Sequence, residues 1–423
     1  MKICVVGLGK LGAPMAAVYR AAGHEVTGCD LNEEFVDKIK HGVAPVDETG
    51  LQDLLNTCGH IPAFTDIGKA AANAEIVFVI VPTPSTEDGS FTAEYVRNAL
   101  FALAARYAYA GESRRYLVVN VVSTVSPGTM QNLVGEFEAA TGGTCGHDFG
   151  VVYNPEFIAL GSVIKDLRRP SFVLVGESDK RSGDVMEAFY ETITGAPVKR
   201  MSLVSAEITK LSLNVALTQR ISFANTVSEL CDRTPGASAT DVLGAIGTDR
   251  RIGPRYLGSG PAYGGPCFPR DGKAFEVAAK RAGSQAWLAT AGDMVNRHQT
   301  VRLANIVEKE SDRKSVFGIL GTAYKPDTAL TTESAGLALV AELERRGRVV
   351  ATYDPQAEHT SPLELLVATC ATLVLTTPWP EFRERLPRLF GRADHEIVLV
   401  DCWNQFESLS DNVQYIVLGE GCQ

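Results

Sequence analysis

A glycine-rich turn near the N-terminus has the spacing of a dinucleotide site. Gly7, Gly9 and Gly12 follow an apolar run that ends at Val6, and they open a segment with helical periodicity. In such a turn the first glycine allows a tight bend, the second lets a pyrophosphate approach the backbone, and the third lets helix and strand pack closely. The helix N-terminus then offers unpaired N–H groups and a partial positive charge to the phosphates.

The next apolar run ends in a carboxylate, Asp30. At this place in a dinucleotide-binding unit, a carboxylate accepts hydrogen bonds from the ribose hydroxyls and would repel a 2′-phosphate. The pattern therefore favours NAD over NADP. Two alternatives remain open: a glycine turn that serves packing only, and an Asp30 that merely caps the following helix.

Cys267 is a candidate nucleophile in the segment Gly-Pro-Ala-Tyr-Gly-Gly-Pro-Cys-Phe-Pro-Arg-Asp. It lies in a glycine-rich segment between helical patterns, and the charges of Arg270 and Lys273 would favour its thiolate form. Most of the nine cysteines instead fall in strands or near helical patterns, where a small hydrophobic residue suffices. Their scattered positions predict thiols in a reducing compartment, the cytoplasm by default, without a disulfide framework or a metal site.

Length and composition indicate a globular protein of two or three domains. The chain has 423 residues, 45% of them hydrophobic and 21% charged, with a formal net charge of −10. This charge disfavours a general affinity for nucleic acid or anionic lipid. No segment approaches the roughly 20 apolar residues that span a bilayer, and the N-terminal apolar run continues into domain structure, unlike a signal peptide.

The elements that must hold these residues alternate between strand and helix at both ends of the chain. Apolar runs without polar alternation predict a parallel sheet covered by helices. The expected N-terminal strands are 2–6, 25–30, 76–81, 117–122, 151–153 and 172–175, and the expected C-terminal strands are 316–320, 349–353, 373–376 and 397–401 with a helix at 334–346.

The middle of the chain has a different pattern. Residues 205–233 keep a helical period without proline or glycine, which is long enough to bridge two domains. The fold class is therefore α/β, with two doubly wound Rossmann-like domains joined by a central helical domain with a long bridging helix. The expected domains are an NAD-binding domain at 1–200, a central helical domain with the Cys267 loop at 201–312, and a second Rossmann-like domain at 313–423.

An ordered set of motifs resembles the UDP-glucose/GDP-mannose dehydrogenase family over nearly the whole chain. The glycine turn and the Cys267 loop belong to this set, and each motif by itself is far less specific than their order. The other motifs of the set are Val-Pro-Thr-Pro with Asp-Gly (81–84, 88–89), Val-Ser-Thr-Val-Ser-Pro-Gly-Thr (122–129), Asn-Pro-Glu-Phe (154–157), Lys210 with Asn214, Asp-Arg-Arg-Ile-Gly (249–253) and Gly-Thr-Ala-Tyr-Lys-Pro-Asp-Thr (321–328).

The resemblance implies an NAD-dependent oxidation of a sugar primary alcohol to a carboxylate in two successive hydride transfers. Cys267 would capture the intermediate aldehyde as a thiohemiacetal, and the second transfer would leave a thioester that water hydrolyses. Glu156 would be the general base of that hydrolysis, and Lys210 with Asn214 would hold the oxyanion. Asp271 and Thr124 would position a water. Leu11, Thr83 and Thr124 would contact NAD beside the glycines.

The spacing of Lys210 and Asn214 supports one part of this assignment independently. Four residues apart on a helix, they share a face, and a cation with an amide donor makes a reasonable oxyanion clamp. A solvated helix surface is the alternative for this pair, and a helix N-terminal acid is the alternative for Glu156.

The resemblance also implies that 201–312 is a dimerisation domain and that 313–423 is a nucleotide-sugar-binding domain. Arg251 would reach across a homodimer, and Lys325 would add a charge from the linker before the last domain. Further substrate contacts are expected from Tyr256, Tyr263, Gly264 and Arg270, beside Glu156, Lys210 and Asn214.

Several positions depart from the family pattern. Ala159 and Leu160 replace an Arg-Glu pair, Pro266 replaces the usual serine before the cysteine, Thr332 replaces an arginine, and Trp403 replaces a basic residue. Thr332 and Trp403 thus remove two guanidiniums that the family pattern would provide. This loss predicts altered substrate recognition, whereas the redox residues are retained. The substrate is then a nucleotide sugar, or a related sugar-bearing nucleoside, that need not be UDP-glucose.

Two other functions compete with this interpretation. A single-step β-hydroxyacid dehydrogenase shares the opening from Gly7 to Met15 and a helical lysine with asparagine four later, but it is much shorter and needs no loop cysteine. A non-catalytic NAD-binding relative is the second, and the departures at 159–160, 332 and 403 keep it open.

Overall fold

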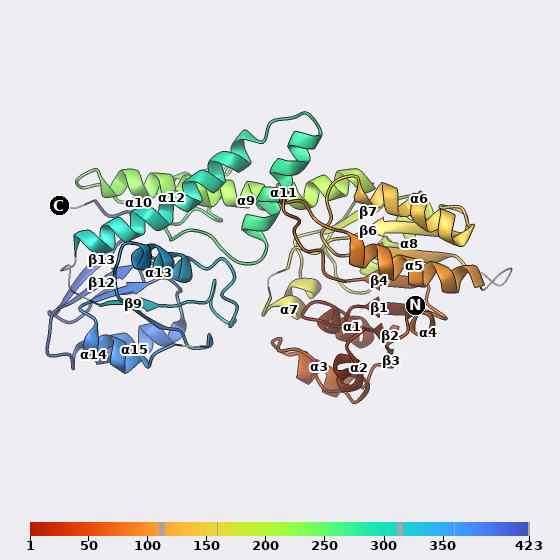
Figure 1. The fold of residues 1–423 in the computed structure, drawn as a ribbon, viewed down its shortest axis with the longest axis horizontal. Coiled ribbons are helices and arrows are strands. Elements are labelled where there is room, and N and C mark those ends of the chain that lie inside the picture. The colour runs from red at the N-terminus through yellow and green to blue at the C-terminus, as the bar shows by residue number, and fades with distance from the viewer. Residues whose placement is uncertain (110–114, 159, 311–315, 359, 422–423) are drawn as a thin grey trace. The chain divides into compact units, whose positions relative to one another are not determined.

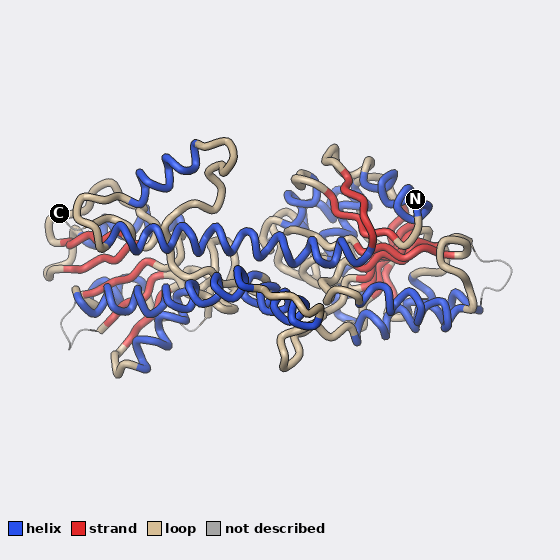
Figure 2. Tube along the Cα trace, turned by 90° about the horizontal axis from the view of Figure 1, so that it is seen from above, coloured by secondary structure: helices blue, strands red, loops and turns tan. Residues whose placement is uncertain are grey.

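A computed structural model describes the chain except for residues 110–114, 159, 311–315, 359 and 422–423. The chain divides into two compact units, Met1–Leu211 and Ser212–Gln423, and each is described by itself. The boundary falls inside the longest helix, α9 (Leu203–Asp232), which runs without interruption (Figure 2).

The first unit is built on one sheet of eight strands in the order β3-β2-β1-β4-β5-β6-β7-β8. Every neighbouring pair is parallel except β6 and β7, which are antiparallel. The strands are β1 Lys2–Val6, β2 Glu25–Cys29, β3 Ala63–Phe64, β4 Ile76–Val79, β5 Leu117–Val121, β6 Phe149–Tyr153, β7 Val173–Glu177 and β8 Val198–Ser202.

Helices cover both faces of this sheet (Figure 1), because its inner strands are buried on both sides. One apolar core packs α1, α3, α7 and α8 on one face, and the other packs α5, α6 and the start of α9 on the opposite face. The helices are α1 Gly12–Ala21, α2 Glu33–Lys40, α3 Leu51–Cys58, α4 Ile67–Ala70, α5 Glu94–Tyr109, α6 Thr129–Thr141, α7 Val163–Arg168 and α8 Lys180–Tyr190.

The strand order reverses direction at the pair β1 and β4. Ile3 to Val6 of β1 lie in register with Ile76 to Val79 of β4. Doubly wound sheets bind ligands outside the carboxyl ends of the strands at such a switch point. The glycine turn that follows β1 therefore lies where a dinucleotide would be expected.

The second unit begins with helices and ends with a smaller sheet. Its helices before the sheet are the rest of α9, α10 Ala239–Thr248, α11 Phe268–Arg281 and α12 Trp287–Lys309. The five strands are all parallel, in the order β10-β9-β11-β12-β13. They are β9 Phe317–Leu320, β10 Val350–Tyr353, β11 Thr372–Leu375, β12 Ile397–Asp401 and β13 Val413–Val417.

Two cores also flank this second sheet. Helices α14 (Leu363–Thr369) and α15 (Pro380–Phe390) pack on one face, and α12 with α13 (Ala335–Arg345) packs on the other (Figure 1). The loop that follows β9, 321–334, packs against the segment that leads to Cys267.

The predicted fold class is confirmed: two doubly wound sheets and a helical middle that contains α9. The expectation of all-parallel pairing was wrong at β6 and β7. Three strands were also missed, because β3 has two residues and because β8 and β13 are only partly buried and carry polar residues, unlike the inner strands. In the described residues no helix has the length and apolarity to cross a membrane.

Candidate active site

The glycine turn after β1 is tight at two positions and open at one. Gly7 has φ +97°, and a Cβ built on it would lie 1.9 Å from the carbonyl oxygen of Ile80. A Cβ on Gly12 would lie 1.8 Å from the carbonyl oxygen of Gly7, so α1 can approach the turn only with glycine there. Gly9 has nothing within 4 Å of its notional Cβ. The open position is the one that would face a pyrophosphate, and Leu11 directly precedes α1.

Asp30 lies beside this turn at the end of β2. Its Oδ2 accepts a hydrogen bond of 2.6 Å from the backbone N–H of Leu8, and its Oδ1 accepts one of 2.8 Å from that of Asn32. The residue is half-buried. A carboxylate has about four lone-pair positions, so two are left for ribose hydroxyls. The open Gly9 and this carboxylate together fit an NAD molecule.

Thr83 and Thr124 follow the neighbouring strands β4 and β5, at the same edge of the sheet. Thr83 is buried and Thr124 is half-buried. Sequence reasoning did not single out Ser123, whose hydroxyl donates to Val81 O at 2.6 Å and accepts from Val81 N at 2.9 Å. Ser123 therefore joins the ends of these two strands and fixes the backbone that carries both threonines.

Glu156 lies just beyond β6 in a group of buried polar side chains. The Tyr190 hydroxyl of α8 donates to Glu156 Oε1 at 3.1 Å and also bonds Asn154 Oδ1. Lys210 of α9 donates from Nζ to the backbone oxygen of Glu156 at 2.8 Å. Burial raises the pKa of Glu156 to about 7, although the Tyr190 hydrogen bond and the charge of Lys210 act to lower it. A carboxyl with that pKa can take up and release a proton near neutral pH.

Asn214 and Asp271 meet in the second unit. Asn214 Nδ2 of α9 donates to Asp271 Oδ2 of α11 at 2.7 Å, and both side chains are buried. Arg270 Nε lies 3.4 Å from the other carboxylate oxygen. The amide of Asn214 is therefore held in a fixed orientation by a charged acceptor, as a preorganised oxyanion donor would have to be.

Cys267 occupies the N-cap position of α11. Its carbonyl oxygen accepts the first hydrogen bond of that helix, 2.8 Å from Asp271 N, and Pro269 lies in the first turn. Among the eight described cysteines, five are buried, Cys58 and Cys145 are intermediate, and Cys267 alone is exposed. A helix N-terminus favours a negative charge, so this position suits a reactive thiolate.

Other residues that were expected to bind substrate lie in the second unit. Lys325 follows β9, and its Nζ lies 5.9 Å from the centre of the Tyr324 ring. Arg251, on an exposed loop, pairs with Asp249 at 2.6 Å. Tyr263 is half-buried, with its ring edge-on to Phe268, and burial raises its pKa to about 12.

The loop of Arg251 has a support that sequence reasoning missed. The guanidinium of Arg220 in α9 donates to three carbonyl oxygens of this loop, at Ile252 (3.0 Å), Gly253 (2.7 Å) and Arg255 (2.9 Å). Tyr256, which directly follows, has φ +61°, a conformation that is uncommon for a residue with a Cβ. No local pattern could reveal Arg220, because its partners lie more than thirty residues along the chain.

Three sequence profiles of one family match the chain in order. They describe an NAD binding domain at 1–194, a central domain at 204–298 and a UDP binding domain at 318–408 of UDP-glucose/GDP-mannose dehydrogenases. A UDP-glucose 6-dehydrogenase of Haloferax volcanii is 30% identical over 97% of this chain and 93% of its own length. The chain belongs to the UDP-glucose/GDP-mannose dehydrogenase family.

Other members of the family are similar at the same level. A GDP-mannose 6-dehydrogenase of Pseudomonas putida is 31% identical over 85% of this chain and 82% of its own. The solved structure of a UDP-glucose dehydrogenase from Pyrobaculum islandicum is 29% identical, with a TM-score of 0.86 over 98% of this chain and 96% of that one. The protein is thus an NAD-dependent enzyme of the nucleotide-sugar dehydrogenase family, as the motifs predicted.

The positions that depart from the family pattern have structural roles of their own. The backbone oxygen of Thr332 accepts a hydrogen bond of 3.0 Å from Gly265 N. Trp403 is 42% exposed, and its Nε1 donates to Thr376 O at 3.0 Å at the carboxyl end of β11. Leu160 packs against the core of the first unit, whereas Ala159 lies outside the described residues.

Proposed function

We propose that the enzyme oxidises the C6 primary alcohol of a nucleotide sugar, UDP-glucose or a close relative, to the uronic acid in two steps. The observation that carries this proposal is Cys267, an exposed thiol at a helix N-terminus beside the buried pair Asn214 and Asp271. A single-step alcohol oxidation needs no such nucleophile. A two-step oxidation does, because an aldehyde carbon must first gain a fourth bond before it can lose a second hydride.

The proposed chemistry removes two hydrides from one sugar carbon. NAD supplies the oxidising power, with two equivalents consumed for each product. The alcohol first loses a hydride and a proton to become an aldehyde, and the Cys267 sulfur then adds to the carbonyl carbon. Loss of the second hydride converts the resulting thiohemiacetal to a thioester. Water adds to the thioester carbon, the carbon–sulfur bond breaks, and the carboxylate leaves with the thiol restored.

The polar residues around these steps would hold charges and move protons. Lys210 and Asn214 would stabilise the oxyanion that forms when sulfur or water adds to the carbonyl. Glu156 would take a proton from the hydrolytic water, a role that its pKa of about 7 supports. Asp271, which orients Asn214, would position a water with Thr124.

The substrate would be recognised by phosphate contacts and by the sugar. Lys325, Arg251 and Arg270 carry the positive charge for a diphosphate, with Tyr256, Tyr263 and Gly264 as further contacts. The match to a UDP binding domain at 318–408 supports a uridine nucleotide. Thr332 and Trp403 are neutral where the family pattern has basic residues, which supports a substrate that differs from the common ones in its recognition.

We also propose that the enzyme is a homodimer. In the second unit α9 exposes Phe223 and Leu230, and α12 exposes Trp287, Leu288 and Met294. Exposed apolar side chains of this size favour a protein interface, and a monomer in sedimentation analysis would contradict the dimer.

The proposed domains are 1–200, 201–312 and 313–423. The proposed location is the cytoplasm, which suits free thiols.

An NADH assay tests the function. The purified enzyme would be given NAD with UDP-glucose, GDP-mannose and UDP-N-acetylmannosamine, and the NADH formed per product would be counted. Two NADH per acid are expected from the wild type on at least one sugar, whereas Cys267→Ser should form little or no acid. Full acid formation by Cys267→Ser would contradict the proposal, and NAD binding without turnover on any sugar would favour a non-catalytic relative.

A further inference from the structure

The segment that leads to Cys267 depends on other parts of the unit for its hydrogen bonds. Residues 260–267 contain no regular helix or strand. Backbone N–H and C=O groups that are taken out of water need partners, and a segment without secondary structure must find them in side chains or in other loops. The positions of these partners determine how rigidly the thiol is held.

Asn296 of α12 supplies two of these hydrogen bonds from one amide group. Its Oδ1 accepts from the backbone N–H of Tyr263 at 2.7 Å, and its Nδ2 donates to the carbonyl oxygen of the same residue at 2.9 Å. A side-chain amide used in this way replaces a neighbouring β-strand, because it pairs with both backbone groups of one residue. It therefore fixes the position and the rotation of the chain at Tyr263.

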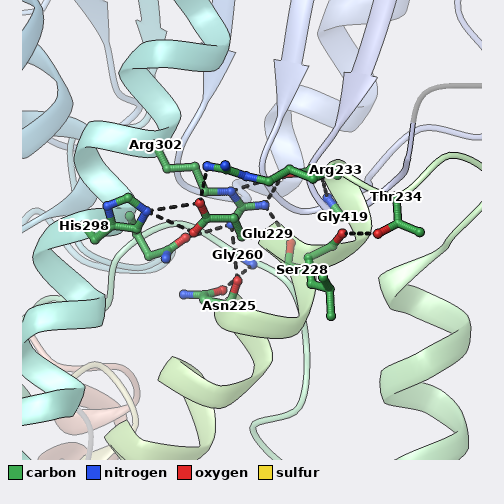
Figure 3. Close-up of polar contacts among 12 residues, drawn as sticks. Asn225, Ser228, Glu229, Arg233, Thr234, Gly260, His298, Arg302 and Gly419 are labelled. Carbon is green, nitrogen blue, oxygen red and sulfur yellow. Dashed lines mark hydrogen bonds and ion pairs between the residues drawn. The ribbon is translucent and has the colours of Figure 1, made fainter.

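Asn225 of α9 also holds the backbone of this segment, through two successive residues. Its Oδ1 accepts from Gly260 N at 3.2 Å, and its Nδ2 donates to Pro261 O at 3.2 Å. The side chain is buried, and its residue is in turn fixed by Arg302 (Figure 3), whose Nη1 donates to the backbone oxygen of Asn225 at 3.5 Å.

Arg302 makes this support rigid. Its buried guanidinium makes five hydrogen bonds: to Asn225 O, to Gln299 Oε1, to Ser228 Oγ and, from two nitrogens, to Asp232. Asp232 also accepts from Gly419 N at 2.6 Å, and Figure 3 shows Gly419 and Gly260 in the same cluster. Because all three nitrogens of the Arg302 guanidinium donate to these partners, the cluster resists rearrangement.

The opposite side of the segment is held by the loop after β9. Gly265 N donates to Thr332 O at 3.0 Å. A Cβ on Gly264 would lie 1.9 Å from the oxygen of Glu333, and one on Gly265 would lie 2.6 Å from the ring of Tyr324. Glu333 itself has φ +51°, so this contact is kept at some backbone strain. The chain before Cys267 is thus enclosed between two asparagine amides and a tightly packed loop.

We propose that Asn296, assisted by Asn225, is a positioning residue that places the Cys267 sulfur for attack on the aldehyde. The inference rests on the proposed function. Bond formation tolerates little misplacement, and a shift of about 1 Å can cost on the order of 100-fold in rate. The first hydride loss does not use the sulfur. A loosened segment should therefore slow acid formation far more than aldehyde formation.

The test compares Asn296→Ala, Asn296→Asp and the matched control Arg297→Ala. Asn296→Ala removes both hydrogen bonds, whereas Asn296→Asp keeps the acceptor for Tyr263 N. Arg297 is the next residue of α12, its side chain is 79% exposed and pairs with Asp293, and no hydrogen bond is described between it and the backbone of 260–267, so its removal should change neither readout. The first readout is hydrogen–deuterium exchange of the peptide that contains Tyr263 and Gly265.

The second readout is the partition between the two oxidations. The assay uses the sugar of the panel that the wild type oxidises fastest, and hydroxylamine traps any aldehyde that is released. Asn296→Ala should form acid about 10- to 100-fold more slowly than the wild type, whereas the rate of aldehyde formation should change less than about threefold. Exchange at Tyr263 should rise about tenfold, as expected for the loss of one hydrogen bond of about 1.4 kcal/mol. Asn296→Asp should lie between Asn296→Ala and the wild type in both.

The outcomes separate this inference from the proposed function. Unchanged exchange in Asn296→Ala would overturn the clamp itself. Faster exchange together with an equal slowing of aldehyde formation and acid formation would overturn the positioning of the sulfur and leave Asn296 a general structural role. If the wild type oxidises no sugar, the proposed function fails, and the exchange experiment still decides whether Asn296 holds the segment.

Discussion

The two sheets begin with the same turn and use it differently. In the first unit Gly7 N donates to Cys29 O at 2.7 Å, and in the second Gly321 N donates to Tyr353 O at 2.8 Å. Both glycines have a positive φ, +97° and +100°. A Cβ built on a second glycine in each following helix, Gly12 or Gly336, would lie 1.8 or 2.2 Å from the oxygen of the first, so the backbones of the two turns pack alike.

The middle position and the carboxylate distinguish the two turns. Where the first turn has the open Gly9, the second has Ala323, whose side chain is buried. Asp30 is half-buried and accepts two backbone hydrogen bonds, whereas Asp354 is 3% exposed and accepts five. The five donors of Asp354 are the backbone N–H groups of Thr322, Ala323, Gln356 and Ala357 and the indole of Trp379.

One topology therefore supports two uses of the same aspartate. Asp354 spends its lone pairs on the protein and ties the turn to the loops around it, so no acceptor remains for a ribose. Asp30 keeps acceptors available beside a turn with open space. The difference explains why only the first sheet is expected to bind a dinucleotide, although both sheets have a switch point.

The largest effect should come from Asp354→Ala. Five donors would lose their charged acceptor, and unsatisfied buried groups cost about 1–3 kcal/mol each, so we expect a loss of unfolding free energy of at least about 3 kcal/mol. Thermal unfolding would measure it, and the affinity for NAD should stay unchanged. The matched variant Asp30→Ala should be destabilised far less. Equal destabilisation of the two would show that the aspartates do not differ in role.

Gly9→Val should have the next largest effect, on cofactor binding. The side chain would point into the open space of the turn and block the pyrophosphate, so NAD should bind on the order of 100-fold more weakly, about 2.8 kcal/mol. The melting temperature should hardly change, because nothing lies within 4 Å of the new Cβ. Titration of NAD by fluorescence or calorimetry measures the effect. Ala323→Gly is the control, and it should leave NAD binding as it is.

Asp30→Ala should lower the affinity for NAD by about tenfold or more, since a hydrogen bond to a charged group contributes about 1.5–3 kcal/mol. The affinity for NADP should fall less, because the same substitution removes the repulsion between the carboxylate and the 2′-phosphate. The ratio of the two affinities is the sharpest measurement. A ratio that stays at the wild-type value would mean that Asp30 does not contact the ribose.

The smallest effect is expected from Tyr190→Phe, at the strand ends of the first sheet. The Tyr190 hydrogen bond lowers the pKa of Glu156, so its loss should raise that pKa further above about 7. Because the base must be deprotonated to act, the acidic limb of the rate of acid formation should move to higher pH, by roughly 0.5–1 unit. A limb that moves to lower pH, or not at all, would argue against Glu156 as the base.

Much of this architecture could be predicted from local patterns. The glycine spacing, the apolar strands and the long run without proline or glycine gave the turn, the inner strands and α9 within a few residues of their bounds. Edge strands such as β8 were missed because a short, partly exposed strand with polar residues resembles a loop in sequence. Supporting residues such as Tyr190, Ser123 and Asn296 were missed because their partners lie on other elements.

Residue types and spacing alone determined the backbone of the two turns, the candidate nucleophile and the family, because these depend on contacts between near neighbours in the chain. Only the tertiary structure decided that Asp354 is saturated while Asp30 is not, that burial brings the pKa of Glu156 near 7, and that two asparagines hold the approach to Cys267. The physical reason is that burial and hydrogen-bond satisfaction are set by groups tens to hundreds of residues away, which no local pattern encodes.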